Sequence, residues 1–379
     1  MIISRSLHLK HVVKLPAAFF VLSLPLTSIA QSQFNVFANL FTIPKSYVVT
    51  YTKTPPIIDG DINDPAWQQA KWTDDFGDIE GELKPKPPLQ TNVKMLWDDS
   101  CLYIAAQIHD PHVWAYLKQH DDIVFRDNDF EVFINPNNTT HQYFEIEYNA
   151  LNTVFDLFLN KPYRNMGTPM VTWNAEGMRS AVKVQGTLND PSDTDTGWTV
   201  EIAIPFKAIS LGNNVQVPTE GALWRINFSR VEWDTKAENG RYVKLKDKSG
   251  HNLPEHNWVW SPQGVVDMHC PERWGYLSFT KSNTNNTGFS LPYSEMQKRY
   301  LWLVYYHEKL WHQQHHVYTT SLKVFGLRKQ VMINGKADTL WVEAAPHQFM
   351  AFISDKKDHI TWSINQEGLV RRYNLLSDE

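Results

Sequence analysis

Apolar and polar residues alternate strictly over residues 129–135, which predicts a half-buried β-strand. Its apolar side chains would face a core, whereas Asp129 and Glu131 would point the other way. A turn-forming Pro-Asn-Asn-Thr-Thr segment follows, and the alternation resumes over residues 143–149 with Glu145 on the polar side. The two segments predict a β-hairpin with one apolar face and one face rich in carboxylates.

The same period of two recurs along most of the chain. Other alternating runs lie at residues 93–97, 102–108, 198–204 and 224–228. Helical periodicity is scarce before residue 280, and short alternating runs separated by turns are typical of two-sheet folds. The sequence therefore predicts a mainly β protein, with an antiparallel β-sandwich or jelly roll over residues 46–280.

The pattern changes after a polar linker at residues 281–292. From residue 293 to about residue 326 apolar residues follow at helical spacing. Three strand-like runs come next, at residues 339–343, 348–354 and 360–364. Residues 293–379 are therefore predicted to form a small C-terminal α+β region.

Residues 1–30 have the features of a secretory signal peptide. A basic start precedes an apolar run, and the Ser-Ile-Ala at residues 28–30 fits a cleavage site. The run is too short and too interrupted by proline for a membrane span. We therefore expect an exported protein, periplasmic or extracellular, with a leader at residues 31–45 and no integral membrane segment once the signal is removed.

The charge balance disfavours one class of partner. The formal net charge is −5 at pH 7, and loss of the basic signal segment would make it more negative. Since nucleic-acid binding depends on cationic surface, no nucleic-acid partner is expected.

The chain has two cysteines, Cys101 and Cys270. In an oxidising compartment they could form a disulfide. Their long spacing does not place them together, so two buried free thiols are the other possibility.

Five short motifs follow one another along the predicted sandwich. They are Ile58-Asp59-Gly60 with Asp64 and Trp67, Leu96-Trp97-Asp98-Asp99 with Leu102-Tyr103-Ile104, Asp127 to Ile134, Gly197-Trp198 with Glu201 to Phe206, and Trp274-Gly275-Tyr276-Leu277. In this order they resemble carbohydrate-binding module family 9, over about residues 46–280. The resemblance implies a non-catalytic β-sandwich that binds a sugar at one end of its sheets. It also implies a possible partner glycoside hydrolase and, in some members, structural calcium.

The resemblance also points to positions for the binding site. Such modules clamp the sugar ring between two Trp side chains, and here those positions hold Phe125 and about Met268. The family's strand Glu is matched by Glu131, and an Arg expected on the next strand aligns with Glu145. The ligand could therefore differ from the one that the family binds.

The chemistry of a sugar adds further candidates. A pyranose needs a flat aromatic surface for its apolar face and charged or amide groups for its hydroxyls. Phe125 and Trp173 are predicted to stack on the ring, Arg126 and Glu131 to bond hydroxyls, and His269 to line the rim. The full set of candidate carbohydrate-binding residues is Phe125, Arg126, Glu131, Glu145, Trp173, Trp260, Met268 and His269.

The favoured function is non-catalytic carbohydrate binding in extracytoplasmic glycan breakdown, and two alternatives remain open. Carboxylates on the polar sheet face could serve a glycoside hydrolase, although no motif singles out a nucleophile and an acid, so no catalytic residue is assigned. Met268-His269 allows a haem or another small ligand, without a C-x-x-C-H motif. Separately, Asp127 and Asp129 offer the hard oxygen ligands that calcium prefers.

Overall fold

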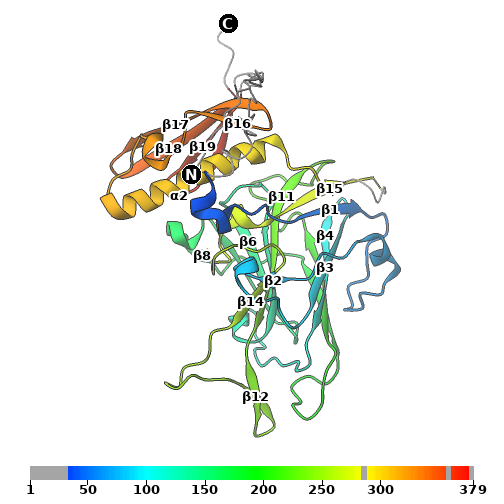
Figure 1. Cartoon of the computed structure of the whole chain (residues 1–379). Coiled ribbons are helices and arrows are strands. Elements are labelled where there is room, and N and C mark those ends of the chain that lie inside the picture. Colours follow the sequence, from blue (N-terminus) through cyan, green and yellow to red (C-terminus); the bar gives the residue numbers. More distant parts are fainter. Residues whose placement is uncertain (1–32, 283–287, 356–359, 375–379) are drawn as a thin grey trace, which may run out of the picture.

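The computed structural model describes residues 33–282, 288–355 and 360–374. The predicted signal peptide and part of the predicted linker lie outside these ranges. Figure 1 shows a β-sandwich with a helix-and-sheet unit packed on one end of it. A small hairpin, β12 (Thr235–Glu238) with β13 (Arg241–Lys244), projects from the other end. No helix within the described ranges is long and apolar enough to cross a membrane.

The sandwich is built from one curled sheet of 13 strands. These are β1 (Ser46–Tyr51), β2 (Gly77–Asp78), β3 (Thr91–Trp97), β4 (Cys101–His109), β5 (Asp129–Asn135), β6 (Tyr143–Asn149), β7 (Val154–Leu159), β8 (Pro169–Met170), β9 (Arg179–Gln185), β10 (Gly197–Pro205), β11 (Leu223–Glu232), β14 (His256–Val259) and β15 (Gly275–Thr280). Their order is β8-β7-β6-β5-β11-β15-β1-β3-β4-β10-β9, and β14 joins β11 to β2. Short 3-10 helices lie between them: η1 (Asn35–Phe41), η2 (Pro65–Gln69), η3 (Gly81–Leu83), η4 (Val124–Arg126), η5 (Tyr163–Asn165) and η6 (Pro271–Arg273).

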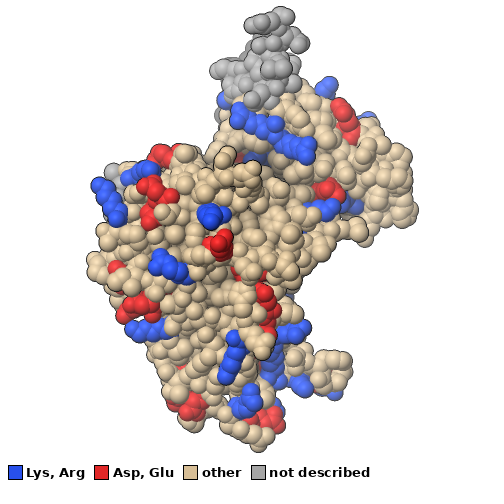
Figure 2. All heavy atoms as spheres, turned by 180° about the vertical axis from the view of Figure 1, so that it is seen from behind, with Lys and Arg blue, Asp and Glu red and all other residues tan. Residues whose placement is uncertain are grey.

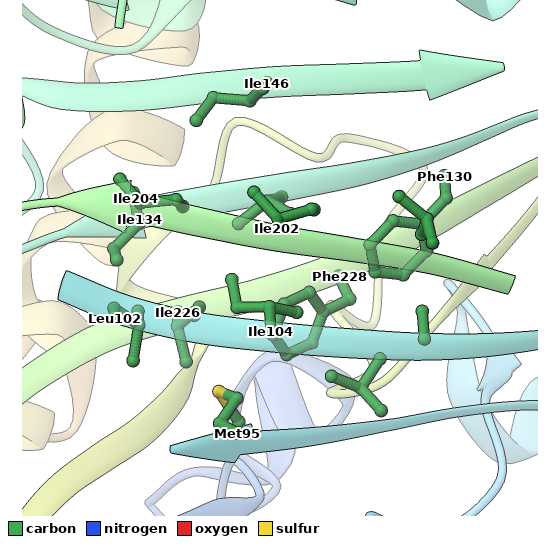
Figure 3. Packing of buried hydrophobic residues seen from close by; sticks show 14 of the residues in the cluster. Met95, Leu102, Ile104, Phe130, Ile134, Ile146, Ile202, Ile204, Ile226 and Phe228 are labelled. Carbon is green, nitrogen blue, oxygen red and sulfur yellow. The ribbon is translucent and has the colours of Figure 1, made fainter. Parts of the chain in front are cut away.

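The alternating pattern places the core as predicted. Phe130, Ile134 and Ile146 point between the layers and meet Ile202 and Ile104 from the opposite half of the sheet (Figure 3). Burial of these side chains is the main stabilising term, at roughly 25 cal/mol per Å² of apolar surface. The mainly β sandwich is therefore confirmed. One feature was not predicted: β1 runs parallel to both β15 and β3, because alternation defines a face and not a direction.

Of the two possibilities for the cysteines, the structure has the free thiols: neither Cys101 nor Cys270 forms a disulfide, and only Cys270 is fully buried. Cys101 begins β4, where it packs beside the small apolar cluster around Trp67. Cys270 is buried next to η6, where Arg164 Nη1 donates to its sulfur at 2.8 Å. The two thiols therefore sit in different surroundings, and each remains a free thiol.

The C-terminal unit consists of a helix on a five-stranded antiparallel sheet. The helix is α2 (Tyr293–His315), followed by η7 (Leu322–Phe325). The strands, in sheet order, are β16 (Gln330–Ile333), β17 (Lys336–Ala345), β18 (Gln348–Asp355), β19 (Ile360–Asn365) and β20 (Val370–Asn374). The three middle strands were predicted, whereas the edge strands β16 and β20 were not. Edge strands are short and need little apolar alternation, so their sequence signal is weak.

Residues 33–45 are not a detached leader, because η1 packs on the C-terminal helix. Phe41 is buried in the C-terminal core, and the ring centroids of Phe34 and Tyr300 are 5.2 Å apart. Arg299 Nη2 also donates to the Phe41 carbonyl at 2.7 Å. The segment before the sandwich thus helps to hold the C-terminal unit in place.

Glu308 on α2 gives the C-terminal unit a predicted pH dependence. It is fully buried, one of its oxygens has no donor among the described residues, and burial raises its pKa from 4.5 to about 7. The folded state therefore binds the Glu308 proton more tightly than the unfolded state, and this contribution to stability is lost as pH rises from about 4.5 to 7. Glu308→Gln removes the titration, so we expect it to be more stable than the parent by up to about 3 kcal/mol at pH 8.

Urea unfolding at pH 4 and pH 8 checks this expectation. At pH 4 the two proteins should have nearly equal free energies of unfolding, because Glu308 is protonated in both states. Glu343→Gln, at an exposed position, is the matched control and should change neither value. An equal difference between Glu308→Gln and the parent at both pH values would contradict the pKa assignment.

Candidate functional site

The polar face of the β5–β6 hairpin forms part of a groove of about 540 Å³. Its carboxylates are Glu131, Glu145, Glu147, Glu255 and Asp267. Apolar side chains from β5, β7 and β11 line much of the rest, among them Phe133, Phe155, Leu157 and Val231. The groove therefore combines acidic groups with an apolar wall, as a binding site for a partly apolar, hydroxyl-rich ligand requires.

Three acids meet closely in this part of the sandwich. Asp129, Glu131 and Glu147 each place one carboxylate oxygen within 4.8 Å of the others, and all three are buried. Glu131 and Glu147 are direct register partners on β5 and β6. The alternation that buries Phe130 and Val132 therefore also gathers the acids on the opposite face.

Burial shifts the pKa values of these acids upward. It raises the pKa of Glu131 to about 7. Burial and then the neighbouring carboxylates raise the pKa values of Asp129, Glu145 and Glu147 well above their usual range. Near neutral pH the group can therefore offer both O–H donors and oxygen acceptors to a ligand.

His269 lies at the edge of the same groove. Its Nδ1 is 2.9 Å from the Tyr143 hydroxyl, and its Nε2 is 3.9 Å from Glu145 Oε2. Burial, reinforced by Arg164, lowers the pKa of His269 to about 4. The imidazole is therefore neutral at ordinary pH and can donate or accept a hydrogen bond.

Two aromatic rings are exposed on the groove lining. Phe125 on η4 is 37% exposed, and its backbone is fixed because its N–H donates to Glu147 Oε2 at 3.0 Å. Tyr163 on η5 is 43% exposed and packs edge-on to His269, with ring centroids 4.4 Å apart. The turn after η5 is tight, since a Cβ at Gly167 would collide with the Lys161 carbonyl oxygen. Both rings thus line the groove and remain partly exposed.

Five of the predicted binding residues line this groove together. They are Phe125, Glu131, Glu145, Met268 and His269. They come from three separate parts of the chain, and their role in binding stays a prediction. Tyr163 was missed, because nothing in its irregular segment marks one aromatic residue as facing a groove.

Three other predicted residues lie outside the groove. Trp260 is 1% exposed, with its ring in the core against Phe228 and the backbone of Gly275, so it cannot stack on a sugar. Trp173 packs on Phe144, with ring centroids 4.8 Å apart, on the core side of the hairpin. Arg126 is exposed and does not line the groove. Trp173, Trp260 and Arg126 therefore do not belong to this groove, and neither tryptophan lies where it could stack on a ligand there.

Asp127 also has a different role from the one predicted. Its Oδ2 accepts hydrogen bonds from the backbone N–H groups of Tyr116 and Leu117, at 2.7 and 2.9 Å, and from Asn149 Nδ2 at 3.1 Å. These donors hold the preceding loop against the hairpin. Asp127 does not belong to the group of acids that meet within 4.8 Å, so it does not join Asp129 there.

Two further polar residues of the sheet are used by the fold. Glu201 on β10 accepts from the backbone N–H groups of Asp59 and Gly60, at 3.1 and 2.7 Å, and therefore fixes that turn. Arg225 on β11 pairs with Glu295 of α2 at 2.9 Å. Neither side chain is available to a ligand in the groove.

The family is shown by comparison with known proteins. The model of the carbohydrate family 9 binding domain-like family matches residues 58–261, which is more than half of the chain. This chain belongs to that family, so the resemblance predicted from the motifs is confirmed.

Similar stretches occur in two larger enzymes. The chain is 25% identical over 179 residues to exoglucanase XynX of Acetivibrio thermocellus, and the aligned stretch covers 47% of this chain. It is 27% identical over 176 residues to endo-1,4-beta-xylanase A of Thermotoga neapolitana, and this aligned stretch covers 45% of the chain. In both cases the match spans only 14% of the relative's own length.

Two solved structures are similar to parts of the chain. One is a carbohydrate binding module family 9 from Caldicellulosiruptor kristjanssonii in complex with cellotriose, with 16% identity and a TM-score of 0.41 over 65% of this chain and 100% of that one. The other is a putative carbohydrate-binding protein from Bacteroides uniformis, with 17% identity and a TM-score of 0.46 over 62% of this chain and 99% of that one.

Proposed function

We propose that this protein is an exported, non-catalytic carbohydrate-binding protein that acts in extracytoplasmic glycan breakdown beside a glycoside hydrolase. The observation that carries the proposal is the groove that sets Phe125 and Tyr163 beside buried carboxylates, in a chain of the family 9 binding domain-like family. One relative is named endo-1,4-beta-xylanase A, and this name supports a plant-type polysaccharide such as xylan as the first ligand to test.

The groove chemistry supports a sugar in two ways. The partly exposed rings of Phe125 and Tyr163 offer the flat apolar contact that a pyranose ring needs. Glu131, Glu145 and His269 offer acceptors and donors for its hydroxyls in a desolvated setting, where each hydrogen bond to a charged group contributes about 1.5–3 kcal/mol. Basic and acidic side chains are interspersed on the face shown in Figure 2, and that face has no broad cationic patch for a polyanion.

A glycan-binding screen tests the proposal. We expect saturable binding to at least one oligosaccharide, and an affinity about tenfold lower for Phe125→Ala, since loss of one stacked ring removes about 1.4 kcal/mol. Tyr373→Ala is the matched control, because Tyr373 is an aromatic residue of similar exposure, at 39%, on β20.

Other outcomes identify the alternatives. Release of reducing sugar that is lost in Glu131→Gln would show a hydrolase, and a Soret band from the purified protein would show haem. Absence of binding to every glycan by a folded sample would overturn the proposal.

A further inference from the structure

The acids beneath the groove include oxygens that nothing in the described part of the chain satisfies. Asp129 is 0% exposed, and its Oδ2 has no hydrogen-bond partner. Glu145 is 6% exposed, and its Oε2 also lacks a partner. Buried carboxylate oxygens are normally bonded, so each of these calls for a partner that a protein group does not supply.

No basic side chain compensates the group. Among the described residues, no Lys or Arg nitrogen forms an ion pair with Asp129, Glu131 or Glu147, and Glu145 has only His269 nearby, at 3.9 Å. Lys244 attracts Asp129 and Glu255 through space, but it forms no ion pair with them, and its ammonium group lies 3.3 Å from the centroid of the Trp233 ring. Several buried carboxylates without a positive partner are costly unless protons or a cation neutralise them.

The geometry fits one ion. Calcium binds oxygens at about 2.3–2.6 Å, so oxygens that share one ion lie within about 5 Å of each other. One oxygen each from Asp129, Glu131 and Glu147 meets this limit, because all lie within 4.8 Å of one another.

The ligands are also held in place by the backbone. Val231 N–H donates to Asp129 Oδ1 at 3.2 Å, and Phe125 N–H donates to Glu147 Oε2 at 3.0 Å. Such secondary contacts orient a carboxylate and leave its other oxygen for a metal.

We propose that Asp129, Glu131 and Glu147 bind a divalent, oxygen-preferring cation such as calcium at the floor of the groove. Glu131 and Glu147 both line the groove, so the ion's remaining coordination positions face the space where a ligand would lie. A hydroxyl oxygen of that ligand completes the coordination in place of water; this second part rests on the proposed sugar binding, whereas the cation site stands without it.

A second acidic group, His120 with Asp121 and Asp156, serves as the internal comparison. His120 faces Asp121 at 3.2 Å through one ring nitrogen and Asp156 at 3.1 Å through the other, and both His120 and Asp121 are exposed. Both of its acids thus already contact a histidine of the same chain. Asp121→Asn is therefore a matched control that removes one acid from a similar cluster.

Titration calorimetry with calcium chloride on the chelator-treated full chain tests the cation site. We expect one saturable site in the parent and in Asp121→Asn, and an affinity at least about tenfold weaker in Asp129→Asn. Thermal unfolding checks that Asp129→Asn is folded, and there calcium should raise the melting temperature of the parent more than that of the variant. Absence of calcium binding by the parent at millimolar concentrations, or equal binding by Asp129→Asn, would overturn the site.

The second part has its own readout. Glycan affinity should fall at least about tenfold when calcium is replaced by chelator. If chelator does not change glycan affinity although the protein binds calcium, the ligand hydroxyl does not coordinate the ion. That result would contradict the second part alone and would leave the cation site and the sugar-binding groove supported. Calcium binding without any glycan binding would overturn the proposed function alone.

Discussion

Replacing Glu295 by alanine is expected to destabilise the folded protein by about 3–5 kcal/mol, because it leaves a buried arginine without its partner. Glu295 lies in the first turn of α2 and is 1% exposed at its side chain, against 8% for Arg225 of the sandwich. Its Oε2 accepts from Arg225 Nη2 at 2.9 Å and from the Tyr276 hydroxyl at 3.2 Å. Its Oε1 accepts from Lys298 Nζ at 2.7 Å.

Glu295 balances the buried charges of Arg225 and Lys298, and alanine at this position cannot do so. Burial alone would raise the pKa of Glu295, but Lys298 and Arg225 outweigh it, and the pKa lies below its usual value. The carboxylate is therefore ionised in the folded protein and joins the C-terminal unit to the sandwich. Without it, two buried cations face each other across an emptied space.

Urea unfolding at pH 7 measures this effect. Glu238→Ala, which breaks the exposed Lys236–Glu238 pair of 3.3 Å, is the matched control and should cause a much smaller loss, since exposed ion pairs contribute little. A loss in Glu295→Ala as small as that of Glu238→Ala would mean that the buried pair does not hold the two units together.

The second large effect is expected for ligand binding. Glu131→Ala should weaken glycan affinity by about 10- to 100-fold, since it removes a buried acid whose hydrogen bond to a hydroxyl contributes about 1.5–3 kcal/mol. The fold should survive, because β5 keeps its backbone hydrogen bonds and the remaining acids repel one another less.

Titration calorimetry with the best glycan from the screen, in calcium and in chelator, gives the two affinities. Glu343→Ala on the C-terminal sheet is the control and should bind as the parent does. A loss below about threefold for Glu131→Ala in both buffers would place the ligand away from this carboxylate.

The sequence was most informative where a strand has one buried face. Strict alternation placed Phe130 and Ile146 in the core and Glu131 and Glu145 on the groove side, and the structure confirms those faces. The parallel pairing of β1 with β15 and β3 could not be predicted from the sequence, because an alternating strand can pair with either a parallel or an antiparallel neighbour.

Loop aromatics were the least predictable part of the site. Trp173, Trp260 and Phe125 all lie in loop-like stretches, yet only Phe125 keeps an exposed ring on the groove. Whether such a ring is exposed depends on tertiary contacts, such as the packing of the Trp260 ring on Gly275. Likewise, Asp127 has the same side-chain chemistry as Asp129, and only the folded loop at Tyr116 and Leu117 shows that its oxygen is already bonded.

The central claim is that a sugar binds in the groove between η4 and the β14–η6 segment. The most direct test is an NMR titration of methyl-¹³C-methionine protein, because Met268 lines the groove whereas Met332 and Met350 lie on the C-terminal sheet. Met268→Leu assigns the Met268 resonance. The account predicts that a bound oligosaccharide shifts the Met268 methyl resonance saturably and leaves those of Met332 and Met350 unchanged. Saturable binding that shifts the Met332 or Met350 resonance and leaves Met268 unchanged would contradict it.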